Sequence, residues 1–237
     1  MDLIELTPTV WQLPLPVGHV HLVRLEDGFA AVDTGVPGTA PAVLAALRQL
    51  GAGPERLRQI LLTHSHIDHM GSAAELVAAS GAELLAGAGD AAVISGRQPE
   101  PQPVHTPVEA ELHRKVSAAF GTATAPTPLP VDRELTEGAA LPGWTEPVQV
   151  LEVPGHTPGG IALFLPESGL LFSGDIIGTG PDSAHLGPFN LDRDRAIASF
   201  HRLAALEPRI LAVPHGTPVT TGATALLRAA TPELDWI

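Results

Sequence analysis

The sequence predicts a mixed α/β fold in which helices cover the faces of β-sheets. Short runs rich in Val, Ile and Leu alternate with alanine-rich stretches along most of the 237 residues, which is the pattern of strands separated by helices. Hydrophobic residues make up 44% of the chain, enough to bury a full core. The length allows one large domain or two small ones, and we expect one domain over residues 1–237.

Turn residues set the boundaries of the expected elements. The sequence Glu-Asp-Gly at 26–28 has the chemistry of a hairpin turn. Pro41 suits the first turn of a helix, and Gly51 and Gly81 suit helix ends. The expected strands are Val20–Leu25, Phe29–Val32, Gln59–Leu62, Val148–Val153, Ile161–Leu165, Leu170–Phe172 and Ile210–Val213. The expected helices are Pro41–Leu50, Ser72–Ala79 and Arg193–Leu206.

A proline-rich segment at about residues 96–143 interrupts this pattern. Its prolines lack a backbone donor and disfavour regular strand pairing, and they flank one expected helix, Glu109–Phe120. We interpret the segment as an insertion between two halves of the domain. Strands followed by Asp33 and His64 precede it, and strands followed by Asp175 and His215 come after it. This repetition is compatible with a duplicated sandwich.

Composition excludes several classes of function. With 13 Lys+Arg against 26 Asp+Glu and a formal net charge of -13, the chain is not expected to bind nucleic acid. The absence of cysteine excludes disulfides, thiol nucleophiles and cysteine-bound zinc. Apolar runs are shorter than the ~20 residues of a membrane helix, and no export leader follows Met1, so we expect a cytoplasmic protein without membrane contact. The abundance of Ala, Leu and Pro would suit a homodimer.

Residues 63–69, with the sequence THSHIDH, concentrate the chemistry of the chain. A loop leaving the preceding strand can direct His64 and His66 towards one point and Asp68 and His69 towards another. Imidazole and carboxylate ligands without thiolate suit a divalent metal such as zinc, with iron or manganese as alternatives. One loop cannot complete two coordination spheres, so further ligands should follow other strands.

Three further candidate ligands follow expected strands in this way. His156 lies in the sequence PGHTPGG, whose glycines and prolines fix a sharp turn. Asp175 follows Leu-Phe-Ser-Gly, and His215 follows Leu-Ala-Val-Pro. Taken singly, each could be an ordinary turn residue. Their common position after strands favours metal binding.

These motifs resemble the metal-binding motifs of the metallo-β-lactamase superfamily, and the resemblance extends from about Val20 to Thr217. It implies an αββα sandwich with two metals at one edge of the paired sheets. It also implies that Asp33, in Val-Asp-Thr-Gly, lies behind the ligands and orients one of them. The implied ligands are His64, His66 and His156 for the first metal, Asp68, His69 and His215 for the second, and Asp175 for both.

The expected chemistry is hydrolysis by a binuclear metal centre. Two cations about 3.5–4 Å apart can hold a bridging hydroxide, because metal binding lowers the pKa of water from about 15.7 towards about 7. This hydroxide would attack an electrophilic carbonyl or phosphorus, and Asp68 or the second metal would assist the departure of the leaving group. The same ligands leave two alternatives, a persulfide dioxygenase with a single iron and a metal-binding protein without catalytic activity.

The expected substrate is a small-molecule ester, thioester or lactone. The chain is similar to glyoxalase II enzymes but ends soon after His215, before the basic helical domain with which those enzymes bind glutathione. Lactonases of the family use a tyrosine near their metals, and this chain has none. Phosphodiesterases need a positively charged approach, which a chain with a net charge of -13 does not offer. Secreted β-lactamases generally lack an aspartate equivalent to Asp175.

The proline-rich segment and residues 178–188 are expected to form the walls of the substrate pocket. The expected apolar contacts in these walls are Phe120, Leu129, Trp144 and Phe189.

The remaining histidines divide into two sets. His21 shares a strand face with His19 and could face the metals, and His185 lies in a loop long enough to reach over them. We expect the other three to be solvated, and they are His105, His113 and His201.

Overall fold

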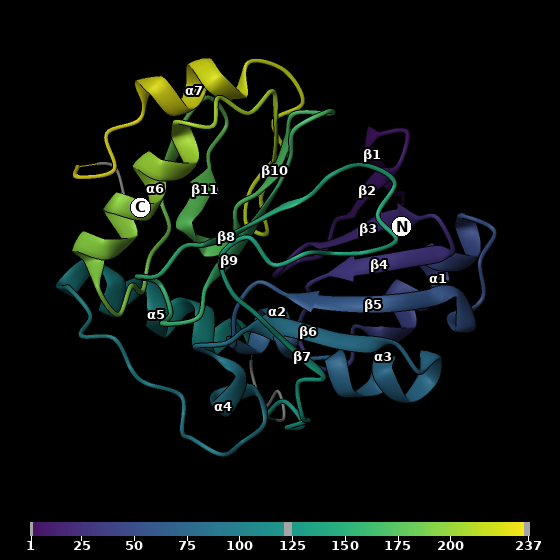
Figure 1. Ribbon diagram of the computed structural model, residues 1–237. Helices are drawn as coiled ribbons and strands as arrows, with labels where there is room; N and C mark the ends of the chain where they lie inside the picture. The colour runs from purple at the N-terminus through teal and green to yellow at the C-terminus, as the bar shows by residue number, and fades with distance from the viewer. Residues whose placement is uncertain (1, 121–124, 235–237) are drawn as a thin grey trace.

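Two β-sheets pack face to face and carry helices on both outer surfaces (Figure 1). This computed structural model describes residues 2–120 and 125–234. Within these residues the first sheet has the strand order β1-β2-β3-β4-β5-β6-β7, and the second has the order β13-β10-β9-β8. The α/β class and the αββα layering expected from the sequence are confirmed.

The elements have the following bounds. The first sheet contains β1 (Ile4–Thr7), β2 (Val10–Leu13), β3 (Val20–Leu25), β4 (Gly28–Val32), β5 (Leu57–Leu62), β6 (Glu83–Gly87) and β7 (Arg133–Leu135). The second contains β8 (Gln149–Glu152), β9 (Ile161–Leu165), β10 (Leu170–Phe172) and β13 (Ile210–Ala212), and a hairpin joins β11 (Ile177–Thr179) to β12 (Ala184–Leu186). The helices are α1 (Ala40–Gln49), α2 (Ile67–Met70), α3 (Ala73–Ser80), α4 (Ala91–Ile94), α5 (Pro107–Phe120), α6 (Arg193–Ala204) and α7 (Ala223–Ala229).

Three apolar clusters hold the four layers together. Between the sheets, Leu61 of β5 and Phe172 of β10 belong to one buried cluster. Leu47 of α1 belongs to a second cluster on the outer face of the first sheet. Phe200 of α6 and Leu227 of α7 belong to a third cluster on the outer face of the second sheet. Burial of each such side chain contributes about 1.5–3 kcal/mol to folding, which makes this sandwich a rigid support for the loops at its edge.

The strand directions bring the candidate ligand loops to one edge of the sandwich. In the first sheet, β4 and β5 are parallel neighbours. In the second, β10 pairs in parallel with β13, while β8 and β10 both run antiparallel to β9. The strands β8, β10 and β13 therefore point the same way. Because each candidate ligand follows the carboxyl end of one of these strands, the fold itself explains their convergence.

The expected helices and strands are confirmed to within about two residues at their ends. The structure adds β1, β2 and β6, which the sequence patterns did not indicate. It also corrects the expectation for the proline-rich segment, because β7 pairs with β6 in parallel after the last proline of the run 126–130. Residues 178–188, expected to be a loop, are largely the β11–β12 hairpin.

Of the residues expected in the pocket wall, Trp144 lies in the core and the half-buried Leu129 packs against it. Trp144 is buried between the sheets, and its indole Nε1 donates a hydrogen bond of 2.9 Å to Oε1 of Gln59 at the amino end of β5. The candidate ligands follow the opposite end of that strand. Leu129 packs against the cluster under α1 and α3. The side chain of Phe120 lies outside the described residues.

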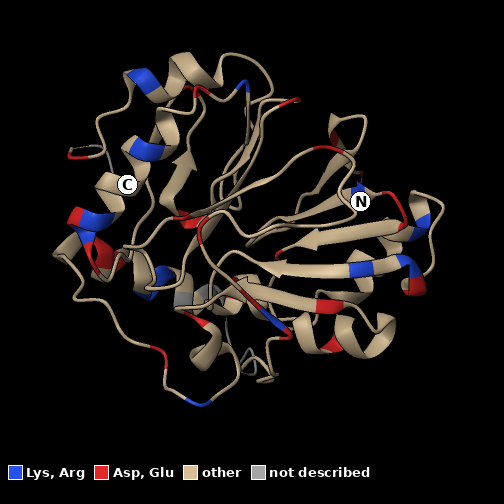
Figure 2. Ribbon diagram, viewed as in Figure 1, with Lys and Arg blue, Asp and Glu red and all other residues tan. Residues whose placement is uncertain are grey.

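Charged residues lie mainly on the helices, in loops and near strand ends (Figure 2). Arg56 and Arg58, at the amino end of β5, both form ion pairs with Asp27 at 2.8 Å. Among the described residues, no helix combines the length and the apolar character needed to cross a membrane.

Candidate metal centre

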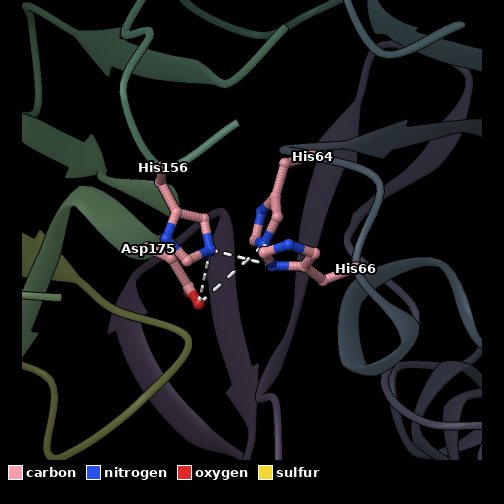
Figure 3. Close-up of side chains that lie close together, drawn as sticks. All are labelled: His64, His66, His156 and Asp175. Atoms are coloured by element: carbon pink, nitrogen blue, oxygen red, sulfur yellow. Dashed lines mark hydrogen bonds and ion pairs between the residues drawn. The ribbon is translucent and has the colours of Figure 1, made fainter. Parts of the chain in front are cut away.

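The first group of candidate ligands comprises His64, His66, His156 and Asp175 (Figure 3). His64 and His66 follow β5, His156 lies between β8 and β9, and Asp175 follows β10. Nδ1 of His66 lies 3.0 Å from Nε2 of His64 and 2.9 Å from Nε2 of His156. One ligand atom from each of the four residues lies within 4.8 Å of the others. The structure thus brings together the three imidazoles expected at the first metal.

The second group comprises Asp68, His69 and His215, again with ligand atoms within 4.8 Å of one another. Asp68 and His69 lie on α2, and His215 follows β13. Oδ2 of Asp68 is 3.2 Å from Nε2 of His215 and 3.7 Å from Nε2 of His69. These are the three residues expected to belong to the second metal alone.

The carboxylate of Asp175 faces both groups. Its Oδ2 is 3.8 Å from Nε2 of His64 and 3.5 Å from Nε2 of His156, which belong to the first group. The same oxygen is 3.4 Å from Nε2 of His215, and Oδ1 is 3.3 Å from Nε2 of His69. The side chain thus occupies the position that a shared ligand requires.

The chemistry of these side chains fits divalent cations. Nε2 of His69 and Oδ1 of Asp175 are buried and lie 3.3 Å apart, but neither atom makes a hydrogen bond of good geometry among the described residues. Buried polar atoms without partners are rare because they lose hydration without compensation. A cation would satisfy both atoms. Imidazole nitrogens and carboxylate oxygens are ligands that zinc and other first-row divalent metals accept.

The three imidazoles of the first group are neutral at pH 7. Burial lowers the pKa of His64 and of His66, and it lowers the pKa of His156 to about 3. Neutral imidazole is the form that binds a cation. The protein therefore holds this group ready for a metal without the need to remove a proton.

The second group contains charges of both signs. Burial raises the pKa of Asp68, but His69 and His215 outweigh it and hold that pKa at about 2. Burial lowers the pKa of His215, but Asp175 and Asp68 raise it to about 10. The same two carboxylates raise the pKa of His69 well above its usual value, against the effect of burial. In the metal-free chain, protons on these imidazoles compensate the carboxylates, and a bound cation displaces them.

Asp33 lies directly behind the ligands, as expected from the sequence. Its Oδ2 is 2.9 Å from Nδ1 of His69, and its Oδ1 accepts a hydrogen bond of 2.8 Å from the backbone N–H of Thr63. The hydroxyl of Thr63 is in turn 3.0 Å from Nδ1 of His64. Asp33 has a φ of 62°, a left-handed conformation that Asp and Asn tolerate better than most residues. This turn aims its carboxylate at the ligands.

The turn that carries His156 is closed against the start of α6. The backbone N–H of Asp192 donates to the carbonyl of Gly155 at 2.9 Å. Gly155 has a φ of +135°, and a Cβ there would lie 2.2 Å from the backbone nitrogen of Ala196. Only glycine permits this approach, which explains the Pro-Gly-His sequence.

The structure corrects the expectation that His21 faces the metals. His21 is buried beside Phe172, and its Nε2 is 3.2 Å from Oε1 of Gln12. His19 instead supports the turn of a ligand. Its Nδ1 accepts a hydrogen bond from the N–H of Leu15, so its Nε2 is the donor to the carbonyl of Gly216, at 3.0 Å.

His185 is not part of either ligand group. It lies on β12 opposite Gly178 of β11, and its imidazole packs so closely over that glycine that a Cβ would lie 2.5 Å from Nε2. The expectation that His185 lies in a loop is therefore wrong, because the residue belongs to a hairpin strand, and its reach over the metals stays a prediction.

Two acidic residues beside the site were missed by sequence reasoning. Glu100, from the proline-rich segment, has its Oε1 3.3 Å from Nε2 of His66, the nitrogen that points away from the other ligands. Burial, together with the charge of Asp68, raises the pKa of Glu100. Asp90 follows β6 and is fully buried. Neither residue lies in a recognisable motif, so its position depends on how distant segments pack.

The proline-rich segment also contacts the loop that follows β12. The rings of His105 and His113 lie 5.4 and 5.7 Å from the ring of Phe189. His113 is exposed, as expected, whereas His105 is half-buried and not simply solvated. Glu109 is buried, and its Oε2 accepts from the backbone N–H of Thr106 at 2.9 Å. Its Oε1 accepts from the backbone N–H of Phe189 at 3.0 Å. His201, in contrast, is exposed, as expected, and pairs with Glu233 at 2.6 Å.

Known proteins resemble this chain over most of its length. The "Probable metallo-hydrolase YflN" of Bacillus subtilis is 27% identical over 91% of this chain and 87% of its own. A hydroxyacylglutathione hydrolase of Cereibacter sphaeroides is 36% identical over 69% of this chain, a match that spans 53% of that relative. The crystal structure of the metallo-β-lactamase MIM-1 of Novosphingobium pentaromativorans has the same fold, with a TM-score of 0.71 and 23% identity over 96% of this chain and 86% of its own.

The relatives named as hydrolases support the enzyme class expected from the sequence, a metal-dependent hydrolase. The sequence profile of the Metallo-beta-lactamase superfamily matches residues 14–233. This match covers every residue of both ligand groups. The chain belongs to the metallo-β-lactamase superfamily.

Proposed function

We propose that this chain hydrolyses an acyl bond of a small molecule, in an ester, a thioester or a lactone, at a pair of divalent cations. The proposal depends above all on Asp175, whose carboxylate lies within 3.8 Å of imidazole nitrogens from both groups. A shared ligand of this kind is what couples two cations into one catalytic site.

The proposed ligands are those of the two groups described above. His64, His66 and His156 hold one cation, Asp68, His69 and His215 hold the other, and Asp175 contacts both. Zinc is the proposed metal, because imidazole and carboxylate ligands suit it and the chain has no cysteine. Iron and manganese accept the same ligand types, and elemental analysis distinguishes the three.

The residues of the chain contribute by position and by proton transfer. When bound, the cation pair supplies an activated water at neutral pH and polarises the acyl oxygen. The ligands fix where that chemistry takes place, and Asp33 fixes the orientation of His69 through a contact of 2.9 Å. Asp68, which is ionised at neutral pH, would accept a proton from the attacking water and pass it to the leaving oxygen or sulfur. Its Oδ2, 3.2 Å from Nε2 of His215, lies at the edge of the second group, where such a transfer can take place.

Two observations support an acyl substrate. The relatives named hydroxyacylglutathione hydrolase act, as their name states, on a thioester of glutathione. A formal net charge of -13 disfavours polyanionic substrates such as nucleic acids.

A substrate panel with protein of measured metal content tests the proposal. The panel contains a lactone, a thioester, an aryl ester, a β-lactam and a phosphodiester. We expect turnover of at least one of the first three substrates, loss of turnover after chelation and its return with Zn²⁺. Asp68→Ala should lose one of two bound cations and lower kcat about 100-fold or more. The exposed Asp194 on α6 provides the control, because Asp194→Ala should leave turnover unchanged.

Three results would contradict this function. Chelated protein as active as the original would exclude a metal mechanism. Parental kcat in Asp68→Ala would exclude the proposed proton carrier. One iron per chain together with oxygen uptake on a persulfide would instead identify a dioxygenase.

A further inference from the structure

Asp90 is a buried carboxylate at the junction of the two sheets. It follows β6 and precedes α4, and its exposed fraction is 0%. No lysine or arginine forms an ion pair with it among the described residues. A buried carboxylate without a cation must be compensated by hydrogen bonds. The hydrogen-bond partners of Asp90 therefore indicate its role in the structure.

The partners of Asp90 are backbone groups of the two loops that carry the first ligand group. Oδ2 accepts a hydrogen bond of 3.0 Å from the N–H of Ser65, which lies between His64 and His66. Oδ1 accepts one of 2.7 Å from the N–H of Gly159, in the turn that contains His156. One loop follows a strand of the first sheet and the other links two strands of the second. A single side chain thus connects the segments that supply all three imidazoles.

The backbones around Asp90 touch so closely that the connection has little freedom. A Cβ on Gly159 would lie 2.2 Å from the backbone nitrogen of Asp90. A Cβ on Gly87 would lie 2.0 Å from the carbonyl oxygen of Gly159. The hydroxyl groups of Thr157 and Ser65 also lie beside the carboxylate. The two loops are therefore held by directional bonds within a packed contact, which fixes the distance between them.

The contacts of Asp90 stop at the first group. Its hydrogen bonds to Ser65 and Gly159 involve segments next to His64, His66 and His156. The second group is supported from elsewhere, since Asp33 holds His69 and His19 contacts the turn of His215. Asp33 also reaches His64 through the hydroxyl of Thr63, so Asp33 serves both groups, whereas the side-chain hydrogen bonds of Asp90 described above go to the loops of the first group.

We propose that Asp90 is a positioning residue that holds the three imidazoles of the first group at binding distance before a metal arrives. Ordering the two loops in advance lowers the entropic cost of binding. The inference relies on the proposed assignment of His64, His66 and His156 to one cation, but not on any substrate. It predicts that Asp90 controls the affinity of the first group and leaves that of the second unchanged.

Asp90→Asn tests this role with a side chain of the same size. The amide has one oxygen, so it can accept from only one of the two loops, and its NH₂ group faces the N–H of the other. We expect the first group to bind Co²⁺ or Zn²⁺ about 10- to 100-fold more weakly. Measuring Co²⁺ absorption in an Asp68→Ala background isolates the first group, and an His156→Ala background isolates the second.

Asp132→Asn is the matched control. Oδ2 of Asp132 accepts from the N–H of Leu84 at 2.8 Å, at the other end of β6. The control therefore replaces a carboxylate beside the same strand without touching a ligand loop, and its amide oxygen can still accept this one hydrogen bond. We expect parental metal affinity in this variant. If both substitutions weakened metal binding by the first group equally, Asp90 would contribute only to general stability, and the proposal would be overturned.

Other outcomes also decide the matter. Parental affinity of the first group in Asp90→Asn, or equal weakening of both groups, would overturn the inference. If that variant does not fold, hydrogen exchange of the unaltered metal-free chain provides the test. The amides of Ser65 and Gly159 should then exchange slowly, and fast exchange of either one would contradict preorganisation. Loss of first-group affinity without turnover of any substrate would support Asp90 and reject the proposed hydrolase.

Discussion

Replacing Asp33 by Asn should change which nitrogen of His69 carries a proton. The carboxylate now faces Nδ1 of His69 at 2.9 Å and the N–H of Thr63 at 2.8 Å. An amide whose oxygen keeps the contact to Thr63 directs its NH₂ group at Nδ1 of His69. That nitrogen must then accept, so the proton of the neutral ring moves to Nε2. Nε2 is the atom that faces Asp175 at 3.3 Å, and a protonated nitrogen cannot bind a metal.

The expected magnitude follows from the bond that is lost. A hydrogen bond to a charged group contributes about 1.5–3 kcal/mol, which corresponds to about 10- to 100-fold in the affinity of the second group. Asn accepts the left-handed conformation at this position, so backbone strain should not add to the effect. The affinity can be measured by Co²⁺ titration of the second group, and ¹⁵N spectra of the His69 ring report its tautomer. Unchanged affinity, or a ring that keeps its proton on Nδ1, would refute this reasoning.

Two further predictions follow from other buried groups. Asp175→Ala should weaken both cations together, each by about 10-fold or more, whereas loss of only one in a stoichiometric titration would show that the carboxylate is not shared. His21 concerns stability, because burial, with a contribution from His19, lowers its pKa to about 3. The unfolded chain gains a proton near pH 6.5 while the folded chain does not, so stability is lost as the pH falls below about 6.5, by about 2 kcal/mol from this group at pH 5. Urea unfolding at pH 7 and pH 5 measures the loss of stability in each protein. His21→Gln should lose about 2 kcal/mol less than the parent between these two pH values. An equal loss in both proteins would contradict the assignment of this pH dependence to His21.

The candidate site could be predicted because its ligand residues lie in short, recognisable motifs of the sequence. Each ligand follows a strand, and strands of one direction bring their ends to the same edge of the sandwich. Asp175 and His215 are separated by 40 positions in sequence, but β10 and β13 are parallel neighbours. At these positions the sequence motif after each strand and the direction of the strand in the sheet indicate the same site, as expected for residues at rigid strand ends.

Residues whose role depends on distant packing could not be predicted. Asp90 and Glu100 have no motif, and only the contact between the sheets brings Asp90 beside Gly159. Trp144 looked like a pocket residue because it borders the proline-rich segment, but Gln59 provides a buried partner for its indole N–H and draws it into the core. The strand β6 was missed because its five residues show no alternation, a consequence of burial between parallel neighbours.

The double use of Glu109 has a consequence for how specificity can diverge in such proteins. One oxygen of its carboxylate completes the start of α5 at Thr106, and the other holds the backbone of Phe189. If the proline-rich segment alone were replaced by that of a relative, the backbone N–H of Phe189 would lose its acceptor. If only the loop that contains Phe189 were replaced, the buried carboxylate of Glu109 would lose a donor. The proline-rich segment and the loop that contains Phe189 are therefore structurally coupled. Chimaeras that exchange both segments together should fold, whereas chimaeras that exchange only one should not.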